Sequence, residues 1–82
     1  MEDKFFVYAL ISAKDKRIYV GFSGDLDKRI HEHNSGKTKS TKGFRPWTLL
    51  YFEEVQGRDS ARKKEKYYKS GIGKEFLKSL LT

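Results

Sequence analysis

The sequence predicts a small α+β domain in which helices pack on a three-stranded sheet, with its elements in the order ββαβαα. Short runs rich in aromatic and β-branched residues indicate strands, and later segments repeat apolar residues at helical spacing. Glycine, proline and polar clusters separate these segments. The 82 residues suffice for one domain over 1–82, with a compact core.

Turn and cap residues place the element boundaries. The apolar run Phe5–Ile11 predicts a first strand, and the polar stretch after it predicts a hairpin turn. Gly36 is expected to end the first helix, and Gly71 the second. Pro46 suits the entry to a strand. The expected strands cover about 5–11, 17–21 and 47–52, and the expected helices cover about 25–34, 60–70 and 74–81. The pairing direction of the third strand stays open.

Composition narrows the class of partner. The chain has 18 Lys and Arg against 11 Asp and Glu, a net charge of +7, which favours nucleic acid first and acidic membrane second. It has no cysteine, which excludes a disulfide framework and a thiolate zinc site. The apolar run Phe5–Ile11 is too short to span a membrane. We therefore expect a soluble cytoplasmic protein.

The first predicted helix carries charge beside its apolar stripe. Leu26, Arg29, Ile30 and His33 stand at i, i+3, i+4 and i+7, which share one helix face. An unpaired buried guanidinium is costly, so an anion would be its natural partner. Arg29 and His33 therefore predict a phosphate-binding site. The alternative is that Arg29 lies at the edge of the stripe and reaches water.

The second predicted helix places a carboxylate on its apolar face. Glu65 falls between Ala61 and Tyr68 at helical spacing. A carboxylate there could bind Mg²⁺, which typically takes one or two carboxylates together with waters and phosphate oxygens. The alternative is a surface ion pair with Lys69 at i+4.

Two tyrosines lie in the predicted hairpin. Tyr8 and Tyr19 stand in adjacent strands, where side chains on the same face meet. Gly21 closes the second strand, at a position where another group could approach closely. Ordinary aromatic packing is the alternative explanation for both tyrosines.

The segment after the first helix is a polar loop, expected over 37–45. It contains several cations and no acidic residue, so it is a candidate for phosphate contacts that hold a strand without reading its sequence. Solvated side chains are the alternative. The candidate residues are Lys37, Lys39, Lys42 and Arg45.

Taken together, these residues resemble the GIY-YIG endonuclease family. The two half-motifs are Phe6-Val7-Tyr8 and Tyr19-Val20-Gly21, separated by a short interval. The stretch from Tyr19 to Gly36, which contains Arg29 and His33, is similar to family members, as is Ala61-Arg62-Lys63-Lys64-Glu65. The resemblance covers nearly the whole chain and is greatest to small standalone members related to the nuclease domain of excinuclease C.

The resemblance implies a role for each candidate residue. Glu65 would anchor one Mg²⁺ or Mn²⁺ ion, and Arg29 would stabilise charge on the phosphate. Tyr8 would act as general base or position the attacking water, and His33 would hold Tyr8 or accept its proton. Tyr19 would take a supporting or a direct part; the sequence does not separate the two tyrosines.

The expected function is that of a metal-dependent endonuclease hydrolysing DNA phosphodiester bonds in DNA repair or recombination. We expect a monomer that acts on DNA and not on membranes; RNA and a partner protein that supplies specificity stay open. The alternative is a catalytically weak or inactive nucleic-acid-binding module of the same fold. Phe6 stands where the motif name has glycine, and Gly71–Lys74 stands where many family nucleases have an asparagine. A protein-interaction module is a further alternative.

Overall fold

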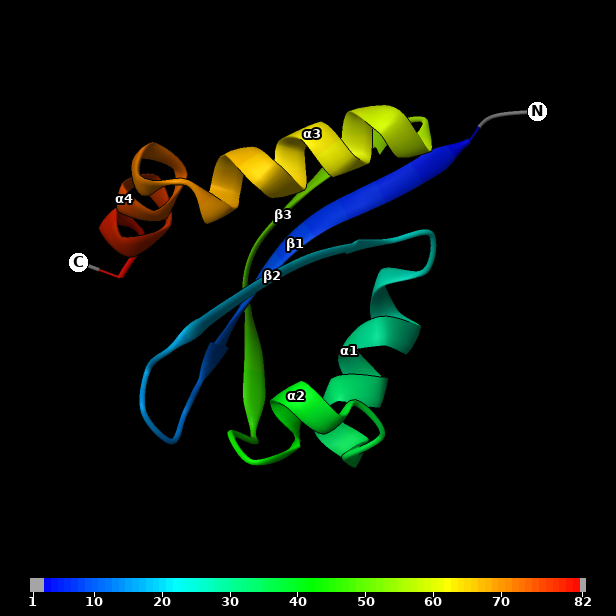
Figure 1. Cartoon of the computed structure of the whole chain (residues 1–82). Coiled ribbons are helices and arrows are strands. Elements are labelled where there is room, and N and C mark those ends of the chain that lie inside the picture. The colour runs from blue at the N-terminus through cyan, green and yellow to red at the C-terminus, as the bar shows by residue number, and fades with distance from the viewer. Residues whose placement is uncertain (1–2, 82) are drawn as a thin grey trace.

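One small sheet forms the middle of the molecule, and helices cover both of its faces (Figure 1). The computed structural model describes residues 3–81. The elements are β1 (Lys4–Ser12), β2 (Ile18–Ser23), α1 (Leu26–Ser35), α2 (Lys39–Lys42), β3 (Trp47–Gln56), α3 (Arg58–Lys69) and α4 (Gly71–Ser79). The predicted α+β class and element order are confirmed, with one short helix added.

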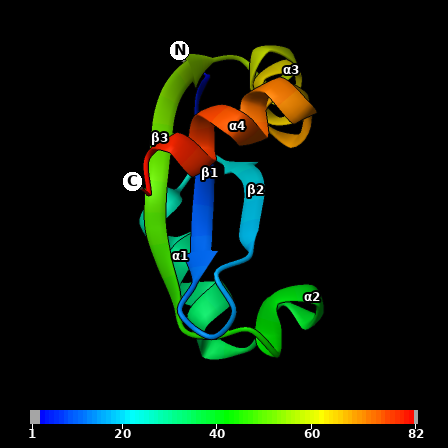
Figure 2. The same ribbon diagram turned by 90° about the vertical axis from the view of Figure 1, so that its left-hand side faces the viewer.

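β1 is the central strand of the sheet. The strand order is β2-β1-β3, and both neighbours run antiparallel to β1, which fixes the pairing of the third strand that the sequence left open. Figure 2 shows β1 between the other two strands. Because side chains alternate across a strand, β1 supplies two core clusters. Val7 and Ala9 pack toward α3 and α4, whereas Tyr8 and Leu10 pack on the α1 side.

Caps define the ends of α1 as the sequence predicted. The Asp25 side chain accepts a hydrogen bond from the Lys28 backbone N–H at 3.1 Å, which caps the first turn. Gly36 ends the helix in the left-handed conformation, with φ of 88°. Strand β3 begins directly after Pro46, as expected.

Several boundaries differ from those predicted. The segment 37–45 is not entirely loop, because α2 forms one turn within it. β3 continues past Phe52 to Gln56, since β1 is long enough to pair with it along its whole length. Helix α3 begins at Arg58 rather than at Ser60. Gly71 does not end α3 but begins α4, because the Ser70 hydroxyl accepts a hydrogen bond from the Gly73 N–H.

Asn34 ties the end of α1 to the start of β3. Its Nδ2 donates to the Trp47 carbonyl at 2.9 Å, and its Oδ1 accepts from the Trp47 N–H at 2.6 Å. The Trp47 indole donates to the Thr41 carbonyl at 2.9 Å, so the same residue also holds α2. Within residues 3–81, no helix is long and apolar enough to cross a membrane.

Asn34→Ala is expected to lower the free energy of unfolding by about 1–3 kcal/mol, because both Trp47 backbone groups lose a partner. Denaturant unfolding measures this effect. Ser35→Ala is the matched control, since the exposed Ser35 hydroxyl donates to the Glu32 carbonyl of its own helix and, within residues 3–81, to no other group. Equal stability of the two variants would contradict the role of Asn34.

Candidate active site

The predicted site residues Tyr8 and His33 meet inside the protein. Tyr8 comes from the middle of β1 and His33 from the last turn of α1, and both are buried. The Tyr8 hydroxyl lies 3.1 Å from His33 Nε2, and His33 Nδ1 lies 2.9 Å from Thr41 Oγ1 in α2. A chain of polar groups therefore runs through a packed core.

The last link of this chain sets the direction of the others. The Thr41 hydroxyl donates its one proton to the Thr38 carbonyl at 3.3 Å. We infer that it accepts from His33, an arrangement in which the imidazole proton lies on Nδ1. His33 Nε2 then carries a lone pair, and the Tyr8 O–H donates to it. The phenol proton thus points at a neutral histidine.

Burial perturbs both titrating groups in this chain. It raises the pKa of Tyr8 to about 12; Tyr19 and, more weakly, the charge of Glu65 add to this increase, whereas the nearby Arg29 guanidinium opposes it. Burial, followed by the positive charge of Arg29, lowers the pKa of His33 below its usual value. Tyr8 is therefore protonated and His33 neutral at neutral pH.

Gly21 makes room for the Tyr8 hydroxyl. It lies directly opposite Tyr8 in the β1–β2 ladder. A Cβ atom at Gly21 would stand 2.8 Å from the Tyr8 hydroxyl oxygen and 3.3 Å from the Tyr19 ring. The sequence predicted that another group could approach Gly21 closely, and the groups that do so are the side chains of Tyr8 and Tyr19.

Tyr19 packs against the imidazole and forms no part of the hydrogen-bonded chain. Its ring centroid lies 4.7 Å from that of His33 and 6.2 Å from that of Trp47. Among residues 3–81, no hydrogen bond joins its hydroxyl to another group. The structure thus distinguishes the two tyrosines: Tyr8 is hydrogen-bonded to His33, and Tyr19 packs on it.

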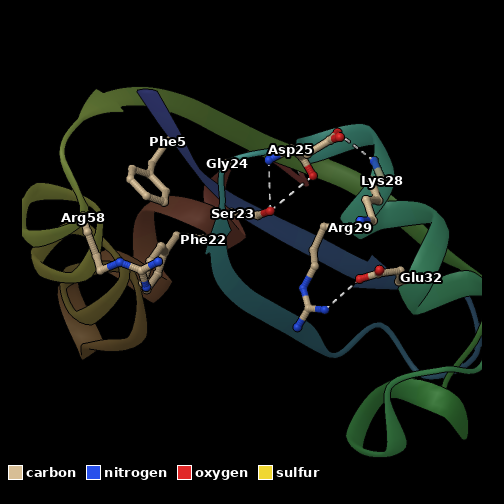
Figure 3. Close-up of a pocket in the computed structure, with 9 residues that line it drawn as sticks. All are labelled: Phe5, Phe22, Ser23, Gly24, Asp25, Lys28, Arg29, Glu32 and Arg58. Carbon is tan, nitrogen blue, oxygen red and sulfur yellow. Dashed lines mark hydrogen bonds and ion pairs between the residues drawn. The ribbon is translucent and has the colours of Figure 1, made fainter. Parts of the chain in front are cut away.

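Arg29 lies at the mouth of the site. The sequence left open whether it would bind an anion or reach water. Its side chain is partly exposed and ion-paired with Glu32 at 2.8 Å. This contact lowers the pKa of Glu32. Arg29 also lines an open cleft of about 390 Å³ (Figure 3). Its guanidinium is close enough to the Tyr8 hydroxyl to oppose the rise in the Tyr8 pKa, and it is also accessible from the cleft.

Glu65 lies on α3, the helix on the other face of the sheet. It forms the predicted i,i+4 ion pair with Lys69 at 3.3 Å, and its side chain is 23% exposed. Its charge nevertheless acts on the Tyr8 hydroxyl. No group of three or more His, Asp or Glu residues that could hold a metal occurs within 3–81. A metal ion at Glu65 would thus depend on water and substrate oxygens, a set that Mg²⁺ accepts.

The predicted basic loop lies beside the site and partly forms α2. Thr41 faces inward to His33, while the four cations of the loop are exposed. Arg45 already has contacts within the protein: its Nε donates to the Lys42 carbonyl at 2.8 Å, and its guanidinium packs against Gly36. The exposed cations are Lys37, Lys39, Lys42 and Arg45.

Thr41 is the site residue that sequence reasoning missed. It stands among lysines in a segment expected to be loop, and no periodicity marks it as buried. The one available signal is its spacing of eight residues from His33, just beyond the helix stop at Gly36. A connection this short keeps the next residues beside the end of α1, where Thr41 can contact His33.

Comparisons with known proteins identify the family of this chain. The model of the GIY-YIG catalytic domain matches residues 4–76. The chain belongs to the GIY-YIG family. It is 35% identical over 79 residues to a UPF0213 protein of Staphylococcus epidermidis, with 95% of each chain covered. It is also 36% identical over 70 residues to the UPF0213 protein YazA of Bacillus subtilis, covering 84% of this chain and 71% of that protein.

A solved relative has the same fold. The solution NMR structure of the UPF0213 protein from Bacillus halodurans aligns with a TM-score of 0.55 at 36% identity, covering 94% of this chain and 84% of that chain. The departure from the GIY-YIG motif at Phe6 lies two residues from Tyr8, on the same face of β1. The Phe6 ring packs edge-on against Phe52 with a centroid distance of 6.2 Å, on the side of β1 next to β3.

Gly21→Ala is expected to lower the free energy of unfolding by about 1–3 kcal/mol, because the buried Tyr8 has no space into which to move. Denaturant unfolding tests this. Gly24→Ala is the matched control: the nearest atom to its Cβ would be the Lys4 carbonyl oxygen at 3.9 Å, an ordinary contact. A Gly21→Ala protein as stable as Gly24→Ala would show that Tyr8 is not tightly confined.

Proposed function

We propose that this protein is a metal-dependent endonuclease that hydrolyses DNA phosphodiester bonds, in DNA repair or recombination. One observation carries the proposal: a buried tyrosine is hydrogen-bonded to a buried histidine, close to an arginine that lines an open cleft. This combination of a tyrosine, a histidine and an arginine adds little stability to a core whose role is only structural. Phosphodiester hydrolysis requires a proton acceptor and a fixed positive charge side by side.

In this proposal, Tyr8 and His33 together remove the proton from the attacking water. A phenol whose pKa is about 12 is rarely ionised at neutral pH, so Tyr8 alone is a poor base. A water would have to reach the Tyr8 oxygen from the side of Arg29; that oxygen then accepts the water proton while the phenol proton passes to His33 Nε2. The imidazole becomes cationic, and no free phenolate has to form. Thr41 keeps Nε2 unprotonated for this transfer and acts as a positioning residue.

Arg29 supplies the fixed charge on the phosphate. Its planar guanidinium suits bidentate binding to phosphate oxygens. Glu32 holds it in the free protein at 2.8 Å, and the phosphate would have to replace or share that contact. The position of Arg29 at the cleft therefore suits a strand that approaches from solvent.

Glu65 would hold the metal ion, Mg²⁺ or Mn²⁺. When bound, the ion polarises the scissile phosphate and stabilises the leaving oxygen. The Glu65 charge also contributes to the raised pKa of Tyr8, so neutralising that charge favours proton loss from the phenol. The exposed cations of the 37–45 segment would add phosphate contacts that do not read sequence.

One observation favours a second candidate, a nucleic-acid-binding module with weak or no turnover. Both charged residues of the proposed site are paired within the protein: Arg29 with Glu32 at 2.8 Å and Glu65 with Lys69 at 3.3 Å. Both pairs are partly exposed, and water screens such pairs, so a substrate and a metal ion can displace them. The two candidates differ in whether DNA is cut.

Cleavage of labelled single-stranded, duplex and branched DNA with Mg²⁺ or Mn²⁺ tests the proposal. The wild-type protein should cut, and Arg29→Ala and Glu65→Ala should each lower the rate by about 10²-fold or more, because each removes a charge that acts in the transition state. Glu75→Ala is the matched control, an exposed glutamate on α4. Metal-dependent cutting should disappear when the metal is chelated.

Three results would count against this proposal. Intact DNA under every condition, together with salt-sensitive binding, favours the binding module. Cutting that survives Glu65→Ala contradicts the assignment of the metal ligand. Cutting of RNA alone would change the substrate class.

A further inference from the structure

The cleft beside Arg29 has features that the proposed hydrolysis does not use. It opens where β2 ends and where α1 and α3 begin, so its walls come from opposite sides of the sheet (Figure 3). Its volume of about 390 Å³ lies in the range of small-molecule sites. Besides Arg29, two further cations line it, Lys28 from α1 and Arg58 from α3.

An aromatic wall supports Arg58. Its guanidinium lies over the Phe5 ring, 5.4 Å from the centroid, and the Phe5 and Phe22 rings pack edge to face at 6.0 Å. A cation held on an aromatic face keeps its N–H donors free at the rim. Arg58 forms no ion pair with any residue in 3–81, nor does Lys28.

The carboxylates of the cleft are already engaged. Asp25 caps α1 through the Lys28 backbone N–H at 3.1 Å, and Glu32 accepts from Arg29 at 2.8 Å. Neither is placed as a partner for the Arg58 guanidinium. Within residues 3–81, the cleft thus has two cations without an ion-pair partner, next to the residue that would bind the scissile phosphate.

We propose that this cleft binds the nucleotide that directly flanks the scissile phosphodiester, with Arg58 and Lys28 on its phosphate and Phe5 and Phe22 against its sugar or base. This rests on the proposed function, because it takes Arg29 as the marker of the cut position. Arg58 is then a substrate-binding residue that lies on a different helix from Arg29. The contact of Arg58 with that phosphate extends the binding site by one nucleotide toward α3.

The test measures binding without cleavage, using a fluorescent single-stranded oligonucleotide in EDTA. Arg58→Ala should weaken binding about three- to tenfold at low salt. It should also reduce the slope of log K against log salt by about 0.7, the value for one lost phosphate contact on a single strand. Lys63→Ala removes the same charge from α3 but lies outside the cleft, and it should leave both quantities near the wild-type values.

Amide NMR shifts with thymidine 5′-monophosphate locate the contact. The wild-type protein should show shifts concentrated at Ser23, Gly24 and Lys28, and Arg58→Ala should lose them while its remaining spectrum stays unchanged. If Arg58→Ala binds like Lys63→Ala, or if the shifts lie elsewhere, the inference is overturned. It is also overturned if the wild-type protein binds neither probe.

The cleavage assay keeps this inference separate from the proposed function. In one outcome, Glu65→Ala abolishes DNA cutting and Arg58→Ala leaves the KM for DNA unchanged. That result would support the nuclease and rule out the subsite. A second outcome is that the wild-type protein never cuts DNA, while Arg58→Ala loses oligonucleotide binding. That result would support the cleft as a strand-binding site and contradict the nuclease.

Discussion

The hydrogen bond from Tyr8 to His33 is the interaction on which the rest of the site depends. Both groups are buried, and each would be costly to leave without a partner. The bond forces several local choices: a glycine opposite Tyr8 in the next strand, a threonine hydroxyl behind the imidazole, and the Tyr19 ring against its face. One polar contact between β1 and α1 thereby determines residues in four elements.

Outside this buried pair, the charged residues of the site form partly exposed ion pairs that a ligand can displace. Arg29 and Glu65 are both ion-paired at the surface of the protein, where water weakens the attraction. A different network on the other face is held more firmly: Tyr68, Tyr51 and Lys64 all bond Glu53 and, against the effect of burial, lower its pKa. The contrast is consistent with a site whose proton-transfer groups are fixed and whose substrate-binding charges are free to exchange partners.

Much of this arrangement follows from local patterns in the sequence. Helical spacing put Arg29 and His33 on one face, and the hairpin brought Tyr8 beside Gly21, because both periodicities are properties of the backbone. Thr41 and Asn34 escaped prediction because their partners are distant in the sequence and polar side chains carry no burial signal. The end of β3 was missed because its length is set by pairing with β1. The contact proposed for Arg58 depends on where α3 begins relative to α1, which only the tertiary structure gives.

The most direct measurement is ¹⁵N NMR of the His33 imidazole as a function of pH, in the wild-type protein and in Thr41→Val. We predict a proton on Nδ1, a bare Nε2, and a ring that stays neutral as the pH falls through 6.5, the ordinary histidine value. Because the unfolded chain binds that proton first, the folded state should lose stability as pH falls through this range. Thr41→Val should lose the tautomer preference. A proton on Nε2, or an imidazolium already present at neutral pH, would contradict the central claim that His33 accepts the Tyr8 proton.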